Sequence, residues 1–458
     1  MLKRKAPLDW GFVPLAREYQ EYQQAVRQAG GGRPFAVRVL RDQGLYSSFS
    51  LNILPPGMEE ARTLRLLDRL VKSLLWVRGG YHIITAGCDA LHAHLQAAYR
   101  AGGARAFDAG FMSTVYERPF EVSEAASPAE ISASREQASS IGRHLNGCRI
   151  GFDAGGSDRK VSAVMDGQTL FSEEVVWHPK VNADPAYHYE GILSALKAAA
   201  AHLPRVDAIG VSSAGVYIGN KAMVASLFLQ VPRESFDRHV KEIYIRASRE
   251  IGDVPLVVAN DGDVTALAGA MSLGVGQVLG IAMGTSEAGG YVDAQMRIMG
   301  WLNELAFVPV DLNPEAMVDE WSDDIGCGVK YFSQDAVIRL APAAGIDLSG
   351  APTPAEKLRV VQQALAQGKP EAAQIYESIG VYFAHALAWY ALFYDISQVL
   401  VMGRVSSGQG GDILVNTARE TLALEYPELA GQIALSLPDE KARRVGQSVA
   451  AASLPEVG

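Results

Sequence analysis

The chain has 458 residues, of which 48% are hydrophobic and 20% are charged, and its formal net charge is −10. This composition is typical of a globular protein, and the length is too great for one ordinary core, so we expect two or three domains. The excess of acidic over basic residues is located after residue 147. A large nucleic-acid-binding surface on the main body is therefore not expected.

The cysteine content and the apolar runs indicate where the protein acts. The three cysteines form no CxxC pair, which favours a reducing, cytoplasmic environment without a disulfide framework. The basic N-terminus has no apolar stretch behind it and is not typical of a secretory signal. The most apolar run, Gly380–Ile396, falls short of about 20 apolar residues and contains a histidine and an aspartate. It predicts a buried helix, and no membrane partner is expected.

The first part of the chain, residues 1–122, is predicted to be a small α/β domain. Residues 33–54 predict two strands around an Asp-Gln-Gly turn, and residues 57–77 have apolar side chains at helical spacing. A strand over 79–87 and a helix closed by glycines follow. Residues 123–147 are predicted to be a linker, because most of this stretch is rich in Ser, Ala and Glu.

Strands and helices alternate after the predicted linker, and residues 312–380 are expected to be mostly helical. Such alternation implies an α/β fold in which helices cover both sides of the sheets. We divide this region into a first lobe over 148–270 and a second lobe over 271–458. The predicted strands are a hairpin over 150–172 and single strands at 205–215, 254–260, 277–284 and 397–403.

Four of these strands end on acidic residues or glycines. In open α/β sheets, ligands bind beyond the carboxyl ends of the strands. Glycine lets a backbone approach phosphate closely, and a carboxylate among phosphates holds Mg²⁺ or orients a hydroxyl or water. Each segment alone could be an ordinary turn or helix N-cap, so their order along the chain is the stronger signal. The segments begin at Asp153, Asn260, Gly284 and Gly403.

In the order of these four segments along the chain, residues 150–455 resemble the ROK family of sugar kinases and sugar-responsive repressors. This family lies within the actin/hexokinase/heat-shock ATPase superfamily. "FDAGGSDRKVSAVMDG" resembles the first phosphate motif, "VVANDGDVTALAGAMSLG" the catalytic stretch, and "LGIAMGTSEAGGYVD" the second phosphate loop. "GWLNELAFVPVD" resembles the sugar motif, and "VLVMGRVSSG" the adenosine motif. The resemblance implies an actin-like ATPase (ribonuclease-H-like) two-lobed fold, here with an extra N-terminal α/β domain. It also implies phosphorylation of a hydroxyl group on a sugar or sugar-like small molecule, with ATP and Mg²⁺ as cofactors, by a homodimer.

The resemblance also implies roles for single residues. Asp261 would accept the proton of the substrate hydroxyl, and Asp153 would hold Mg²⁺ through water. Because Asp261 begins a helix, its pKa is expected to be lowered by the helix dipole. Asn260 and Glu304 would bind sugar hydroxyls. The remaining contacts would be made to nucleotide and phosphate by Gly155, Gly156, Ser157, Gly284, Thr285 and Gly403.

The chain departs from the family pattern at several positions. Phe307 stands where the family has a sugar-binding histidine, and there it would contact the substrate with a more apolar, or simply different, face. Cys327 is the one zinc-loop cysteine that remains, so no zinc is expected. Arg404 replaces a glycine of the adenosine motif and could bind phosphate, stack on adenine or block it. Glu287 adds a carboxylate to the second phosphate loop, where it either points away from the nucleotide or activates water.

These departures leave two alternatives to a kinase. One is a non-catalytic, sugar-sensing regulator of the ROK type. The first 147 residues show no clear helix-turn-helix pattern, which does not favour it. The other is a phosphohydrolase of the same superfamily that uses Glu287 as its base.

Overall fold

The structure is a computed structural model that describes residues 2–136, 141–437 and 440–457. The chain forms two compact units, neither of which is a continuous segment. The unit boundary passes through β12 (Val278–Met283) and β13 (Glu287–Val292). The four-part division made from the sequence follows other boundaries and stays a prediction. Unit 1 is Met1–Gln137, Ile281–Gly289 and Trp301–Leu437, and unit 2 is Ala138–Gly280, Gly290–Gly300 and Pro438–Gly458.

Unit 2 is built on a five-stranded sheet with the order β11-β8-β5-β6-β7. The strands β5, β8 and β11 are parallel, whereas β6 and β7 continue antiparallel, so the expected hairpin is a three-stranded meander. The elements of this unit are β5 (Cys148–Ala154), β6 (Asp158–Met165), β7 (Gln168–Val176), α5 (Pro185–Ala200), β8 (Ala208–Ser213), β9 (Val216–Ile218), β10 (Lys221–Val224), α6 (Arg233–Ser235), α7 (Ile243–Arg249), β11 (Leu256–Asn260), α8 (Asp261–Leu273) and α14 (Glu440–Ala452).

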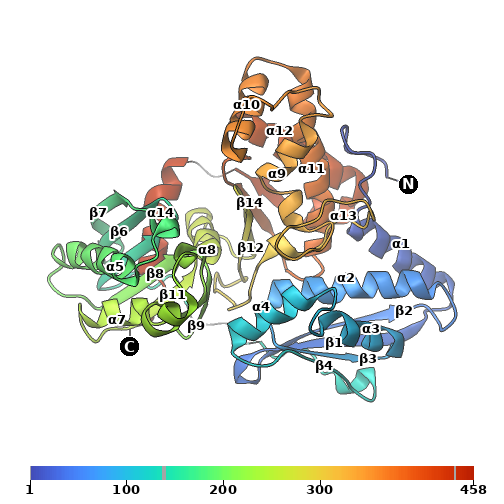
Figure 1. Ribbon diagram of the computed structural model, residues 1–458, viewed down its shortest axis with the longest axis horizontal. Helices are drawn as coiled ribbons and strands as arrows, with labels where there is room; N and C mark the ends of the chain where they lie inside the picture. The colour runs from blue at the N-terminus through green and yellow to red at the C-terminus, as the bar shows by residue number, and fades with distance from the viewer. Residues whose placement is uncertain (1, 137–140, 438–439, 458) are drawn as a thin grey trace. The chain divides into compact units, whose positions relative to one another are not determined.

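Helices cover both faces of the central strands in unit 2, and every residue of β5 and β8 is buried. One face packs against α5 and α7 through an apolar cluster that includes Phe152 and Ile192. The helix α14 packs against the same sheet (Figure 1). It approaches so closely that a Cβ atom on Gly151 or Gly210 would overlap carbonyl oxygens of α14. Glycine at these two positions is therefore what lets α14 pack on the sheet.

The N-terminal part of unit 1 has a four-stranded sheet with the order β2-β1-β3-β4. In Figure 1, α2, α3 and α4 lie along one face of this sheet. The two strands around a turn, the following helix and the next strand all form as predicted. The elements are α1 (Leu15–Gln28), β1 (Arg33–Leu40), β2 (Tyr46–Ile53), α2 (Glu60–Arg78), β3 (His82–Ala86), α3 (Asp89–Tyr99), α4 (Ala106–Tyr116) and β4 (Glu121–Glu124).

The stretch predicted to be a linker is packed as far as residue 136. The strand β4 pairs with β3, Ile131 is buried against Ala36 and Ala86, and Glu136 pairs with Arg41. A few apolar and acidic side chains of this stretch thus find partners that are distant in sequence, and its role as a linker stays a prediction. Residues 137–140 of the predicted linker lie outside the described residues.

A further sheet has the order β13-β12-β14-β15, of which unit 1 holds β14, β15 and parts of β12 and β13. In the same unit α11 packs against α12. The apolar run predicted to be a buried helix forms the second half of α11 and then continues into the turn after Tyr390. No described helix is long and apolar enough to cross a membrane. Residues 312–333 are mainly irregular, contrary to expectation, because side chains such as Asp319 and Ser322 bond to nearby backbone. The remaining elements are α9 (Gln334–Leu340), α10 (Pro354–Ala366), α11 (Pro370–Tyr390), β14 (Gln398–Met402), α12 (Gln409–Glu425), α13 (Pro427–Ala430) and β15 (Ala434–Ser436).

A buried cluster of charges ties the N-terminal part of unit 1 to the irregular segment. One carboxylate oxygen of Asp324 lies 2.6 Å from a nitrogen of each of Arg69, Lys72 and Arg105. Lys72 is fully buried, and its ammonium group also lies 3.6 Å from Asp108. Burial opposes ionisation of Asp324, but the three cations outweigh it and hold the pKa of Asp324 below its usual value. We call this set the Asp324 cluster.

Candidate functional site

The carboxyl ends of the parallel strands in unit 2 bring the two predicted acidic residues to one edge of the sheet. In the strand register, Asp153 is paired with Ser212, and Asn260 with Ser213. The hydroxyl of Ser212 donates a hydrogen bond of 2.8 Å to Asp153. Asp261 follows β11 directly as the first residue of α8. The edge therefore carries Asp153 and Asp261 together, as the order of motifs predicts.

Asp153 is buried at this edge, with 6% of its surface exposed. The pKa of Asp153 is raised to about 6, mainly by burial. The hydrogen bond from Ser212 opposes this rise, and the nearby charge of Asp261 adds to it. Most of the Asp153 carboxylate is thus ionised at neutral pH. A buried carboxylate oxygen with a second carboxylate nearby is a suitable environment for Mg²⁺, which prefers oxygen ligands.

The protonation of Asp261 differs from the expectation. Burial raises the pKa of Asp261 above its usual value, although the Gly262 backbone N–H donates to its carboxylate at 3.0 Å and Lys180 is nearby. The predicted lowering by the helix dipole is therefore wrong in direction. Removal of water from around the carboxylate raises the pKa of Asp261 by more than the N–H groups at the first turn of the helix lower it. A carboxylate with a raised pKa is a better acceptor for a hydroxyl proton.

Asn260 is the N-cap of α8. Its side-chain oxygen accepts from the Gly262 N–H at 2.8 Å, and its amide nitrogen donates to the Gly215 carbonyl at 2.8 Å. The ordinary N-cap interpretation of this residue is confirmed. A contact between Asn260 and a sugar hydroxyl stays a prediction.

The bend after β5 is held from one side by the segment that follows β7. The Trp177 indole N–H donates to the Gly155 carbonyl at 2.7 Å, and the Trp177 backbone N–H donates to the Ser157 carbonyl at 3.1 Å. Gly156 and Ser157 are exposed, and the Ser157 hydroxyl bonds to Asp158 at 3.0 Å. The bend thus presents backbone and a hydroxyl to solvent beside Asp153, which suits a phosphate group.

The predicted second phosphate loop and adenosine motif meet within unit 1. Gly403 has a φ of +98°, and a Cβ atom there would overlap the Met283 carbonyl, one residue before Gly284. The Val405 N–H donates to that carbonyl at 3.0 Å. Thr285 and Arg404 are exposed. These residues belong to unit 1, whereas Asp153 and Asp261 belong to unit 2.

Glu287 is buried in unit 1, with 3% of its surface exposed. One carboxyl oxygen accepts a long hydrogen bond of 3.4 Å from the Tyr390 hydroxyl, and the other has no partner among the described residues. Burial, with a smaller contribution from the charge of Glu304, raises the pKa of Glu287 to about 8. At neutral pH most of this carboxyl group is therefore protonated, which favours neither repulsion of a phosphate nor a role as a base.

A pH-dependent stability follows from this buried acid. The pKa of Glu287 is about 8 in the folded protein against 4.5 ordinarily, so between these values the folded state holds the extra proton. Stability should then fall as pH rises from 5 to 8, by on the order of a few kcal/mol. Glu287→Gln should remove this fall, measured by urea unfolding across that pH range. The exposed Glu315→Gln is the control, and an equal slope in wild type and Glu287→Gln would contradict the assignment.

No protein-family model matches the sequence, and no curated protein matches it. Solved structures do match. A ROK hexokinase from Thermus thermophilus has a TM-score of 0.51 and 18% identity, covering 67% of this chain and 97% of that chain. A ROK family transcriptional regulator, a homolog of the E. coli MLC protein, has a TM-score of 0.51 and 18% identity, covering 68% and 79%. A ROK family glucokinase from Streptomyces griseus has a TM-score of 0.47 and 21% identity, covering 66% and 98%.

The chain has the fold of the ROK proteins. The actin-like α/β fold predicted from the motifs is thereby confirmed. At these identities the likeness establishes the fold, and the activity has to be argued from the residues themselves.

The segment that resembles the ROK sugar motif runs along the end of α2. The backbone N–H groups of Leu302, Asn303 and Glu304 donate to carbonyls of the last residues of α2. The Phe307 ring centroid lies 4.3 Å from that of Trp76, and the rings of Phe107 and Phe111 are also close. Phe307 is therefore part of an aromatic cluster shared with the N-terminal part of the chain. These partners lie about 200 residues away in the chain, so no local pattern around Phe307 indicates them.

The position that resembles the ROK zinc loop is occupied by charged residues. Among the residues that the structure describes, no group of three or more His, Cys, Asp or Glu side chains could hold a metal ion. Cys327 is buried, and its sulfur lies 3.9 Å from the Lys72 ammonium of the Asp324 cluster.

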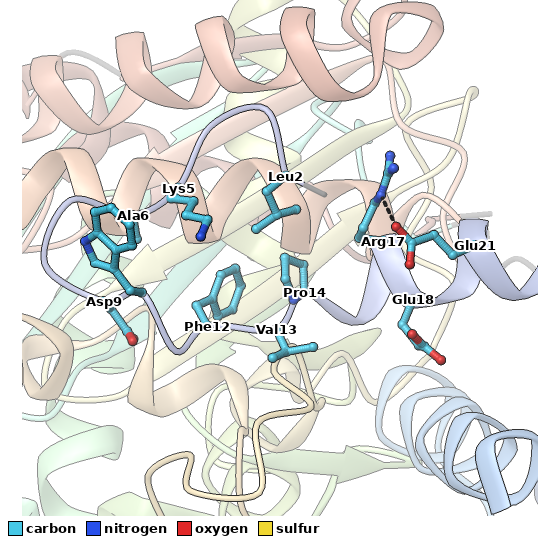
Figure 2. A pocket seen from close by; sticks show the side chains of 11 residues that line it. Leu2, Lys5, Ala6, Asp9, Phe12, Val13, Pro14, Arg17, Glu18 and Glu21 are labelled. Atoms are coloured by element: carbon cyan, nitrogen blue, oxygen red, sulfur yellow. Dashed lines mark hydrogen bonds and ion pairs between the residues drawn. The ribbon is translucent and has the colours of Figure 1, made fainter.

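A cavity of about 280 Å³ lies in unit 1 beside the N-terminal segment (Figure 2). Its lining includes Phe12, Pro14 and Arg17, and Arg17 pairs with Glu21 in the next turn of α1. Asp9, also in the lining, is bonded to Arg339 and Tyr382. None of the site residues predicted from the sequence lines this cavity.

Proposed function

We propose that the protein is a ROK-type kinase that transfers the terminal phosphoryl group of ATP to a hydroxyl of a sugar or sugar-like molecule. The observation that carries this is the meeting of Asp153 and Asp261 beside the glycine bend of residues 155–157. Phosphoryl transfer has a loose transition state, so positioning and charge neutralisation matter more than a strong base. Asp261 would supply the positioning, and a Mg²⁺ ion held by Asp153 would supply the neutralisation.

The residues at the edge fit Mg²⁺ and a phosphate group. Asp153 would hold the ion through water, and the ion would neutralise charge on the phosphates. The backbone of Gly155 and Gly156 and the Ser157 hydroxyl would face the transferred group. Asp261 would orient the acceptor hydroxyl and take its proton. Gly284, Thr285, Gly403 and Arg404 would bind the rest of the nucleotide, as the family resemblance implies.

A sugar-sensing regulator is the second candidate, because a ROK regulator matches the chain with the same TM-score as the hexokinase. Retention of both carboxylates favours the kinase. The hydrolase alternative is not favoured, because burial raises the pKa of Glu287 to about 8 and most of this carboxyl group would hold a proton at neutral pH. A homodimer is proposed from the family resemblance, and a cytoplasmic location from the cysteine content.

The test is transfer of labelled phosphate from Mg²⁺-ATP to a panel of hexoses, amino sugars and polyols. We expect one member of the panel to be phosphorylated. Release of inorganic phosphate at the same rate without an acceptor would indicate a hydrolase instead. A sugar that raises the melting temperature but is never phosphorylated would indicate a regulator.

A further inference from the structure

Lys180 lies in the short 3-10 turn Pro179–Val181, which follows β7 in unit 2. This turn is held in place from both sides. His188 bonds to the Pro179 carbonyl at 3.0 Å through its Nε2, and Trp177 is bonded to both Gly155 and Ser157. The backbone that carries Lys180 is thus tied to the phosphate bend itself.

The Lys180 side chain lies directly over Gly156. A Cβ atom on Gly156 would lie 2.7 Å from Cε and 3.0 Å from Nζ of Lys180. Any residue other than glycine at position 156 would therefore have to displace the lysine. Glycine here does more than form a turn, because its missing side chain leaves room for a cation at the bend.

The ammonium group of Lys180 is exposed and has no hydrogen bond or ion pair within the described parts of the chain. The nearby Lys160, in contrast, is paired with Asp158 at 3.2 Å. The charge of Lys180 also reaches Asp261, whose pKa it lowers. An unpaired cation therefore lies between the glycine bend and the acidic edge of the sheet.

We propose that Lys180 binds the phosphoryl group that is transferred, holding the phosphoanhydride tail of a nucleoside triphosphate against the bend at Gly156. This inference rests on the proposed function and adds a residue that the motifs do not indicate. An ammonium group at this point would neutralise charge on the phosphate oxygens, and the missing Cβ of Gly156 gives it access.

The first test is Lys180→Met, with Lys197→Met as the matched control. Lys197 is an exposed lysine in the last turn of α5, about 18 Å along the helix from its start. We expect Lys180→Met to weaken Mg²⁺-ATP binding, measured calorimetrically, by about tenfold or more and to lower kcat/KM by about 100-fold. Lys180→Arg should recover part of both, and Lys197→Met should match the wild type. Gly156→Ala, which displaces the lysine but keeps its charge, should also weaken binding.

The second readout is the pH dependence of kcat/KM. The titratable groups coupled to Asp261 are Lys180, Asp153, Tyr217 and Tyr244. Because Lys180 lowers the pKa of Asp261, its loss should move the acidic limb of the profile to higher pH. A residue that only supports the fold would not move this limb.

The inference is overturned if Lys180→Met binds Mg²⁺-ATP within twofold of Lys197→Met and keeps the wild-type acidic limb. If the wild type binds Mg²⁺-ATP but phosphorylates no sugar, the proposed function fails and the binding comparison still decides the role of Lys180. If the wild type binds no Mg²⁺-ATP, both are wrong. Equal melting temperatures of the variants exclude a folding defect as the cause.

Discussion

Asp261→Asn is expected to lower kcat for phosphoryl transfer by about 10²- to 10⁴-fold. The substitution keeps an oxygen that can accept from the Gly262 N–H, so α8 should begin as before. It removes the carboxylate that we propose takes the proton of the acceptor hydroxyl. The measurement is transfer of labelled phosphate to the best acceptor, with Mg²⁺-ATP binding followed in parallel.

Asp253→Asn provides the matched control for Asp261→Asn. Asp253 is exposed in the same unit, in the loop before β11, and should give wild-type rates. Binding of Mg²⁺-ATP by Asp261→Asn should change little, because Asp153 and the bend remain. If Asp261→Asn retained kcat within about fivefold of the wild type, Asp261 would not be the proton acceptor.

Asp324→Asn should destabilise unit 1 by about 3–5 kcal/mol. The carboxylate of Asp324 is the shared partner of Arg69, Lys72 and Arg105, so its loss leaves buried cations without enough opposing charge. Lys72 would then keep the Asp108 carboxylate at 3.6 Å and the Cys327 sulfur at 3.9 Å. The expected result is a lower midpoint in urea unfolding, measured at neutral pH.

Asp347→Asn is the control for the stability measurement. Asp347 is exposed and bonds to Ser349, two residues away, so this change should cost less than about 0.5 kcal/mol. A loss below about 1 kcal/mol for Asp324→Asn would show that the Asp324 cluster does not hold the N-terminal part of the chain in place.

The parts of the site that depend on a local pattern of residues could be predicted from the sequence. Asp153 is found at a strand end because an apolar run stops at a carboxylate followed by glycines. Asp261 is found at a helix start because Asn260 is a typical N-cap. Parallel strands place such ends at one edge, so the meeting of these two residues could be expected before any coordinates were known.

The properties that arise from residues far apart in sequence are visible only in the folded chain. Burial sets the direction of the pKa shifts of Asp261 and Glu287, and neither burial can be seen in a local pattern. Phe307 has Trp76 as its partner, and Lys180 reaches Gly156, because packing brings together segments that the chain separates. Solvent exclusion and contact between distant segments are consequences of the complete fold, which is why neighbouring residues could not reveal them.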